Sequence, residues 1–142
     1  MKTILTEIIR ERTDAFIVLE ERKSKIIFLN PKRLLFYEVK VDGDLYPKTN
    51  TNIRRCDYLE WSNQRAEAFY VELKGIDVSS AYEQLLSSVR EISLENIAKR
   101  TAIVVTPHIP KANLKFQKYM KLCKKHGATL LVLNSGRKFP LY

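Results

Sequence analysis

The sequence of 142 residues predicts an α/β fold in which a mixed β-sheet is flanked by helices on both faces. Two observations predict this class. Segments 101–106 and 128–133 are uncharged and rich in aliphatic residues, as buried strands are, and amphipathic helices at 79–98 and 111–126 alternate with them. Upstream of these, several strands joined by short turns indicate a meander of hairpins. The length fits one domain covering residues 1–142.

The first half of the chain is predicted to consist mainly of strands. Ile4, Leu5, Ile8 and Ile9 recur at helical spacing and predict a first helix over 3–12. Segment 14–20 fits either an extension of that helix or a strand. Further strands are expected at 25–29, 34–41, 53–61 and 67–74, with a turn at 42–43, a loop at 47–52 and a polar turn at 62–65.

The two helices of the second half carry recognisable end signals. Ser80 and Glu83 have the spacing of a capping box at the start of helix 79–98. Gly127 is placed to end helix 111–126. That second helix has one apolar side, made of Ala112, Phe116, Tyr119, Met120 and Cys123. Its other side carries five lysines: Lys111, Lys115, Lys118, Lys121 and Lys125.

Composition excludes several classes of protein. Hydrophobic residues make up 45% and charged residues 29%, which does not fit a disordered chain. No window approaches the ~20 apolar residues that cross a bilayer, and early charges at Glu7 and Arg10 argue against a signal peptide. The two cysteines are far apart, which excludes a disulfide scaffold and a cysteine-rich zinc site. We therefore expect a protein of the reducing cytoplasm that has no membrane partner.

The net charge of +9 is unevenly distributed. Residues 1–95 hold fifteen basic and sixteen acidic residues, whereas residues 96–142 hold ten basic residues and no acid. Concentrated positive charge attracts polyanions, so nucleic acid is the favoured partner of the five lysines on helix 111–126. A solvated surface or an anionic membrane surface would also account for the charge.

Three charged residues are predicted to lie together on the hairpin 53–74. With the turn centred between residues 64 and 65, Asp57 pairs with Glu72, and Lys74 shares the face of Glu72. Two carboxylates held close on a covered face repel each other, and a divalent cation with oxygen ligands removes that penalty. A cross-strand ion pair between Lys74 and a carboxylate, without a metal, is the alternative explanation.

Asp57 followed by Glu72-Leu73-Lys74 resembles the D-x(n)-E-x-K signature of the PD-(D/E)XK nuclease superfamily. That superfamily has a restriction-endonuclease-like core of helix, three-stranded meander, helix and strand. The predicted order of elements from about residue 34 onward is similar. The residue before Asp57 is Cys56, where the signature has Pro.

The resemblance implies a metal-dependent nuclease that hydrolyses phosphodiesters, with DNA preferred over RNA as its partner. It implies that Asp57, Glu72 and the backbone carbonyl of Leu73 hold Mg²⁺ or Mn²⁺, and that Lys74 orients or activates the attacking water. By the same resemblance, Glu7 or Glu11 could complete the site and Gln84 occupies a place where some members carry Gln.

Two other functions fit the sequence. One is a catalytically inactive nucleic-acid-binding module or subunit of a larger nucleoprotein complex with the same fold. The other is a structural subunit whose acids merely pair with Lys74. A homodimer or a partner subunit also fits a domain this small.

Overall fold

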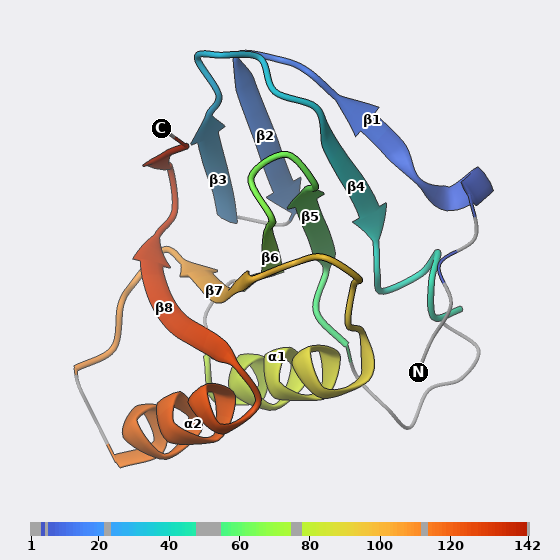
Figure 1. Cartoon of the computed structure of the whole chain (residues 1–142). Coiled ribbons are helices and arrows are strands. Elements are labelled where there is room, and N and C mark those ends of the chain that lie inside the picture. Colours follow the sequence, from blue (N-terminus) through green and yellow to red (C-terminus); the bar gives the residue numbers. More distant parts are fainter. Residues whose placement is uncertain are drawn as a thin grey trace.

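The computed structural model describes residues 4, 6–21, 24–47, 55–74, 78–111 and 114–141, and its centre is a six-stranded mixed sheet (Figure 1). The strand order across this sheet is β1-β4-β5-β6-β7-β8. Its strands are β1 Arg10–Arg12, β4 Phe36–Lys40, β5 Tyr58–Ser62, β6 Glu67–Leu73, β7 Lys99–Thr106 and β8 Ala128–Asn134. β4, β5 and β6 form an antiparallel meander, and β7 and β8 continue the sheet in parallel.

A second sheet of three strands is built from the two ends of the chain. β2 Phe16–Glu21 and β3 Ser24–Leu29 form an antiparallel hairpin, and β9 Arg137–Pro140 adds to β3 in parallel. Segment 14–20, for which helix and strand were both open, is therefore largely strand. The alternation in β2, with Ile17 and Leu19 buried and Val18 exposed, is that of a strand with one covered face.

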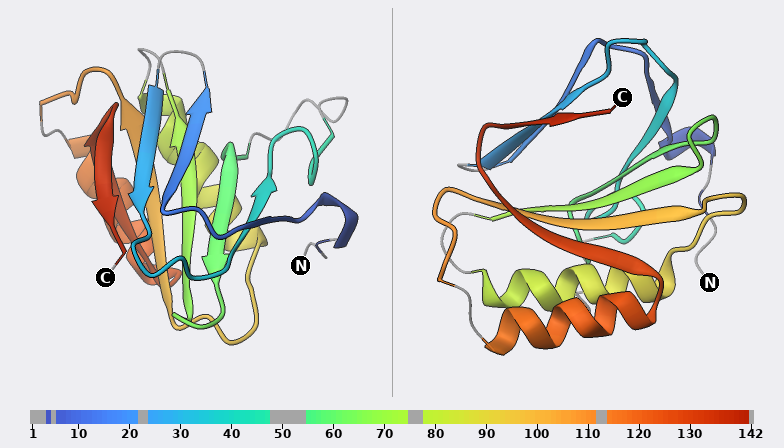
Figure 2. Two further views of the ribbon diagram at one scale, coloured as in Figure 1. Left: turned by 90° about the horizontal axis from the view of Figure 1, so that it is seen from above. Right: turned by 60° about the vertical axis from the view of Figure 1, so that its left-hand side comes forward.

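Both helices lie on the same face of the large sheet (Figure 2). α1 Ser79–Glu91 contacts β6 and β7, and α2 Leu114–Lys125 contacts α1 and β8. The prediction of helices on both faces is wrong, because the three-stranded sheet covers the opposite face. The coarser prediction of an α/β fold with a mixed sheet is confirmed.

The large sheet thus separates two apolar cores. The helix-side core joins sheet residues such as Leu59, Tyr70 and Val104 to Leu85 and Val89 of α1. The hairpin-side core joins sheet residues of opposite parity to the small sheet, with Phe69 in ring contact with Phe28 and Phe139 at 5.0 and 5.5 Å. Because both faces are covered, every residue of β6 is buried, and its charged residues have lost most of their hydration.

The amino-terminal prediction fails. In place of a helix over 3–12 there is a short 3₁₀ turn, η1 Thr6–Ile8, followed by β1. β1 pairs with β4, and the Arg12 guanidinium lies 2.7 Å from the carboxylate of Glu38 on that strand. Pairing with an existing sheet edge therefore replaces the predicted helix over Arg10–Arg12, which follow the isoleucines.

Other predictions agree closely with the structure. The hairpin register pairs Tyr58 with Val71, as the centred turn requires, and Ala66 in the turn has a φ of 52°. Gly127 follows α2 with a φ of 83°.

The predicted limits of the first long helix are wrong. α1 ends at Glu91 rather than 98, and no side chain caps its first residue, so the capping box at Ser80 is not formed. The expected loop 47–52 lies mostly outside the described residues. None of the described helices is long and apolar enough to cross a membrane.

Candidate active site

Asp57 lies at a bend immediately before β5, where the regular ladder with β6 stops. Its amide donates to the Val71 carbonyl at 3.0 Å, and its carbonyl accepts from the Val41 amide at 2.8 Å. Its carboxylate accepts a hydrogen bond from the Leu73 amide at 2.8 Å. The side chain is thereby held against the backbone of β6, and it is 5% exposed.

The bend also changes which face the preceding residue occupies. Strict alternation predicts that Cys56 shares a face with Phe69 and Val71, yet it packs in the helix-side core. The Cys56 amide donates to Ser88 Oγ of α1 at 2.8 Å, which fixes the start of the bend. Burial raises the pKa of the Cys56 thiol, so it is not a reactive nucleophile.

Glu72 is the most unusual residue of this region, because its carboxylate is 1% exposed and poorly satisfied. Within the described part of the chain, neither of its side-chain oxygens accepts a hydrogen bond of normal geometry. Lys74 Nζ lies 3.1 Å from Oε2, so its positive charge acts on the carboxylate even though the two groups are not aligned for a normal hydrogen bond. Burial, followed by the charge of Asp57, raises the pKa of Glu72 to about 9.

Lys74 is held in place by both sheets. Its amide donates to the Val105 carbonyl of β7 at 2.8 Å. Its carbonyl accepts a hydrogen bond from the Ser24 hydroxyl at the start of β3. The ammonium group therefore projects from a backbone that the large sheet and the hairpin fix together.

A third carboxylate, Glu21, stands beside Asp57, and sequence reasoning missed it. Glu21 pairs with Ser24 across the β2–β3 hairpin and lies 3.3 Å from Lys40 Nζ. Burial and the neighbouring Asp57 carboxylate raise the pKa of Glu21, while Lys40 opposes the rise. The only signal in the sequence is a glutamate that ends an alternating segment, and packing of the hairpin on the meander decides where it lies.

The structure brings Asp57, Glu72, Leu73 and Lys74 together at the carboxyl end of β6. It does not bring Glu7 or Glu11 to them: Glu7 is exposed in η1, and Glu11 is exposed on β1, two strands away from β5. Gln84 is buried on α1, where its amide donates to the Arg55 carbonyl at 3.3 Å.

The five lysines of the predicted nucleic-acid surface, Lys111, Lys115, Lys118, Lys121 and Lys125, are all exposed. Four of them, Lys115, Lys118, Lys121 and Lys125, lie on α2, which packs inward through Tyr119 and Cys123. Lys111, predicted to begin this helix, precedes it, because α2 starts at Leu114. Because α2 follows β7 through a short loop, only its first turn starts near the carboxyl ends of β6 and β7. The remaining lysines extend along the helix away from that end of the sheet.

The side chains at this site are of the kind that bind a divalent cation, but their arrangement in this structure is not that of a metal site. Among the described residues, no three His, Cys, Asp or Glu side chains are arranged to hold a metal ion. However, the two buried oxygens of Glu72 accept no hydrogen bond of normal geometry from the described residues, and Asp57 offers a second carboxylate beside it. Carboxylate oxygens are the ligands that Mg²⁺ and Mn²⁺ favour.

A second carboxyl pair lies elsewhere in the large sheet. Glu60 and Glu38 face each other across β5 and β4, and Arg12 binds Glu38. Neither Glu60 oxygen has a hydrogen-bond partner among the described residues. Burial and then the charge of Glu38 raise the pKa of Glu60 well above its usual value. The charged form of Glu60 is therefore unfavourable in the folded protein.

No protein-family model matches the chain, and neither a curated protein nor a solved structure matches it significantly.

Proposed function

We propose that this chain is a metal-dependent nuclease with a restriction-endonuclease-like core, acting on DNA in preference to RNA. The observation that carries the proposal is the buried Glu72 carboxylate. It lies beside Asp57 and Lys74, and among the described residues it accepts no hydrogen bond of normal geometry. The meander β4–β6, the helix α1 and the parallel strand β7 follow one another in the same order as in the PD-(D/E)XK nuclease superfamily, which the sequence resembles. The departure is at the amino terminus, where β1 and the hairpin replace the first helix.

In this proposal Asp57 and Glu72 hold Mg²⁺ or Mn²⁺, together with the backbone carbonyl of Leu73. When bound, the ion supplies Lewis-acid stabilisation to the phosphoryl oxygens. Lys74 orients the attacking water and stabilises charge on the phosphate. Water adds to phosphorus and loses a proton, the bond from phosphorus to one sugar oxygen breaks, and that leaving oxygen takes up a proton to become a hydroxyl.

Glu21 enters the proposal as a positioning residue for Asp57. Burial, followed by the charge of Asp57, raises the pKa of Glu21, and Lys40 Nζ lies 3.3 Å from its carboxylate. Removing its charge by E21Q is expected to weaken metal binding less than E72Q does. The pH profile of cleavage should shift with E21Q, which a purely structural role would not produce.

The test is a cleavage assay with a metal-binding readout beside it. Linear and circular double-stranded DNA, single-stranded DNA and structured RNA are incubated with Mg²⁺, Mn²⁺ or EDTA. E72Q and D57N are compared with E67Q, which removes a carboxylate at the opposite end of β6 that is paired with Arg65 at 3.1 Å. Cleavage and Mn²⁺ binding, both lost in E72Q and D57N and kept in E67Q, are the expected results.

One observation favours the alternative of an inactive nucleic-acid-binding module. Lys74 Nζ lies 3.1 Å from Glu72 Oε2, and the pKa of Glu72 is raised to about 9, so near pH 7 a proton rather than a metal relieves the repulsion between Glu72 and Asp57. An inactive module would bind DNA in a salt-sensitive way without cleaving it, and D57N would change neither property. That outcome, with no Mn²⁺ bound by the wild type, would overturn the nuclease proposal.

A further inference from the structure

β8 is the outer strand of the large sheet, and its outer edge is open. It pairs with β7 on one side, and among the described residues no strand pairs with its other side. Natural proteins usually guard such edges with charged residues, proline or a bulge. The seven residues Ala128–Asn134 contain neither a charge nor a proline.

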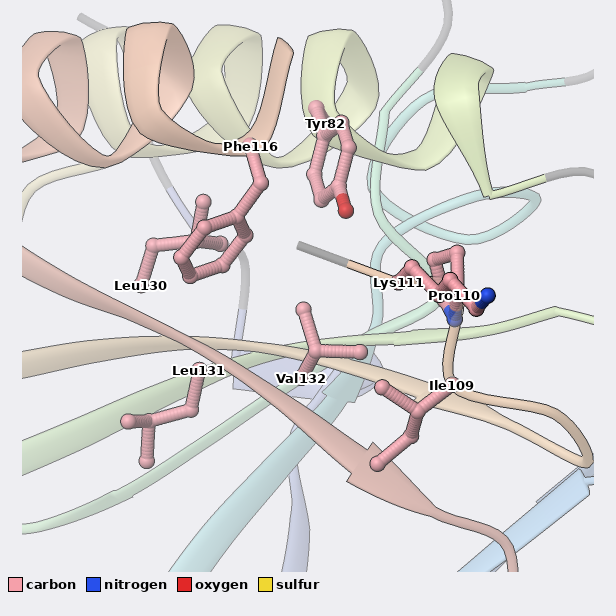
Figure 3. Close-up of a pocket in the computed structure, with 8 residues that line it drawn as sticks. All are labelled: Tyr82, Ile109, Pro110, Lys111, Phe116, Leu130, Leu131 and Val132. Carbon is pink, nitrogen blue, oxygen red and sulfur yellow. The ribbon is translucent and has the colours of Figure 1, made fainter. Parts of the chain in front are cut away.

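The edge is also flanked by a hollow on each face of the sheet. The first hollow, of about 370 Å³, lies on the helix side (Figure 3). Tyr82 and Phe116 reach into it from the helices, and Leu130 and Val132 reach into it from β8. The second, of about 380 Å³, lies on the side of the small sheet between β8 and β9.

The two hollows meet at one residue of the edge strand. Leu131 lines both of them, and Figure 3 shows its side chain pointing away from the hollow that Val132 faces. An extended segment added beside β8 would direct alternate side chains to opposite faces of the sheet. Its successive side chains would therefore enter the two hollows in turn.

The hollows differ in chemistry. The helix-side hollow is apolar, with Ile109 on its loop side 47% exposed, and its one charged residue is Lys111. The opposite hollow is mixed. Its charged residues are Glu67 and two bases that pair with it, Arg65 at 3.1 Å and Lys99 at 3.8 Å. In each hollow the basic residues outnumber the acidic residues by one. The sequence after Glu95 contains no acidic residue.

This charge decides between two kinds of occupant. A second copy of the chain would bring a like net charge of +9 to the edge, together with its own basic α2. A segment with acidic side chains meets opposite charge, and its apolar residues match the helix-side hollow. Strand addition of this kind derives affinity from main-chain hydrogen bonds and specificity from alternating side-chain pockets.

We propose that the open edge of β8 binds an extended segment of a partner protein in which apolar and acidic residues alternate. The bound segment becomes a seventh strand of the large sheet. Its apolar residues fill the hollow under Tyr82 and Phe116, and its acids lie on the face of the sheet that carries Lys99, whose side chain is 72% exposed. This docking site is separate from the carboxylates at the end of β6 and does not depend on the proposed nuclease function.

The test uses a capped, fluorescein-labelled peptide of nine residues in which Phe, Leu and Val alternate with Glu. A second peptide has the same composition with its glutamates grouped at one end, and a third has Lys in place of Glu. Fluorescence anisotropy with the purified wild-type chain is expected to show saturable binding of the first peptide only. Equal binding of the grouped peptide, or no saturable binding of the alternating peptide at 1 mM, overturns the proposal.

A pair of matched variants locates the binding. I109E places an acid at the helix-side hollow, and L114E makes the same change at an 83% exposed leucine that does not line it. I109E should weaken peptide binding by about tenfold or more, whereas L114E should leave it unchanged. Equal effects would refute the site. Sedimentation of the free protein as a dimer that I109E dissociates would assign the edge to a second copy instead.

Discussion

Replacing Glu72 by Gln should change how the stability of the metal-free protein depends on pH. The pKa of Glu72 is raised from 4.5 to about 9 by burial and by Asp57. An unfolded chain loses this proton above about pH 4.5, whereas the folded chain keeps it up to about pH 9. The folded state therefore binds one more proton throughout this window, and stability falls as the pH rises through it.

The size of the effect follows from the linkage of one proton to unfolding. Each pH unit in the window lowers the free energy of unfolding by slightly more than about 1 kcal/mol. Between about pH 6 and pH 8 the wild type should lose roughly 2–3 kcal/mol through this group. E72Q, which has no proton to lose, should not show this loss.

The measurement is urea unfolding at pH 6 and pH 8 in EDTA, followed by the fluorescence of Trp61, the one tryptophan of the sequence, which is 7% exposed. The difference in unfolding free energy between E72Q and the wild type should grow with pH. E67Q, which removes a carboxylate at the other end of β6, is the matched control. Equal pH dependence of E72Q and the wild type would refute the placement of Glu72 as a buried, poorly satisfied acid.

Three further results are expected. E60Q should raise the melting temperature at pH 8, because Glu60 has a raised pKa and folding stability is lost as the pH rises toward it; calorimetry that finds E60Q less stable there would contradict this. Y70F removes a phenol hydroxyl that donates a hydrogen bond to the Ile92 carbonyl and accepts one from Arg100 at 3.0 Å. The free energy of unfolding measured in urea should therefore drop by about 1–3 kcal/mol, and no drop would count against these bonds. In the double variant K118Q/K121Q, the slope of the logarithm of the DNA-binding constant against the logarithm of the salt concentration should become shallower. The change should be about 0.9 for each of the two lysines that contacts phosphate, and an unchanged slope would exclude both as contacts.

The local pattern of the sequence was enough to predict the central elements. Strands 25–29, 67–74, 101–106 and 128–133 and the two helices are present, because their residues satisfy both local preference and the burial that the sheet imposes. The hairpin register also followed from sequence, since a polar turn at 62–65 joins two strands whose side chains alternate. The turn and the alternation are together sufficient to predict that Asp57, Glu72 and Lys74 lie near one another.

The amino-terminal half and the covering of the sheet were decided only in three dimensions. The isoleucines at 4–9 have helical spacing, but Thr6–Ile8 form only a 3₁₀ turn, and the following residues Arg10–Arg12 pair with β4 as a strand. Glu21 reaches Asp57 because the hairpin packs across the meander, and strand order along the chain does not reveal that contact. Sequence periodicity reports which side of an element is buried, whereas the identity of the covering partner depends on contacts between residues far apart in the chain.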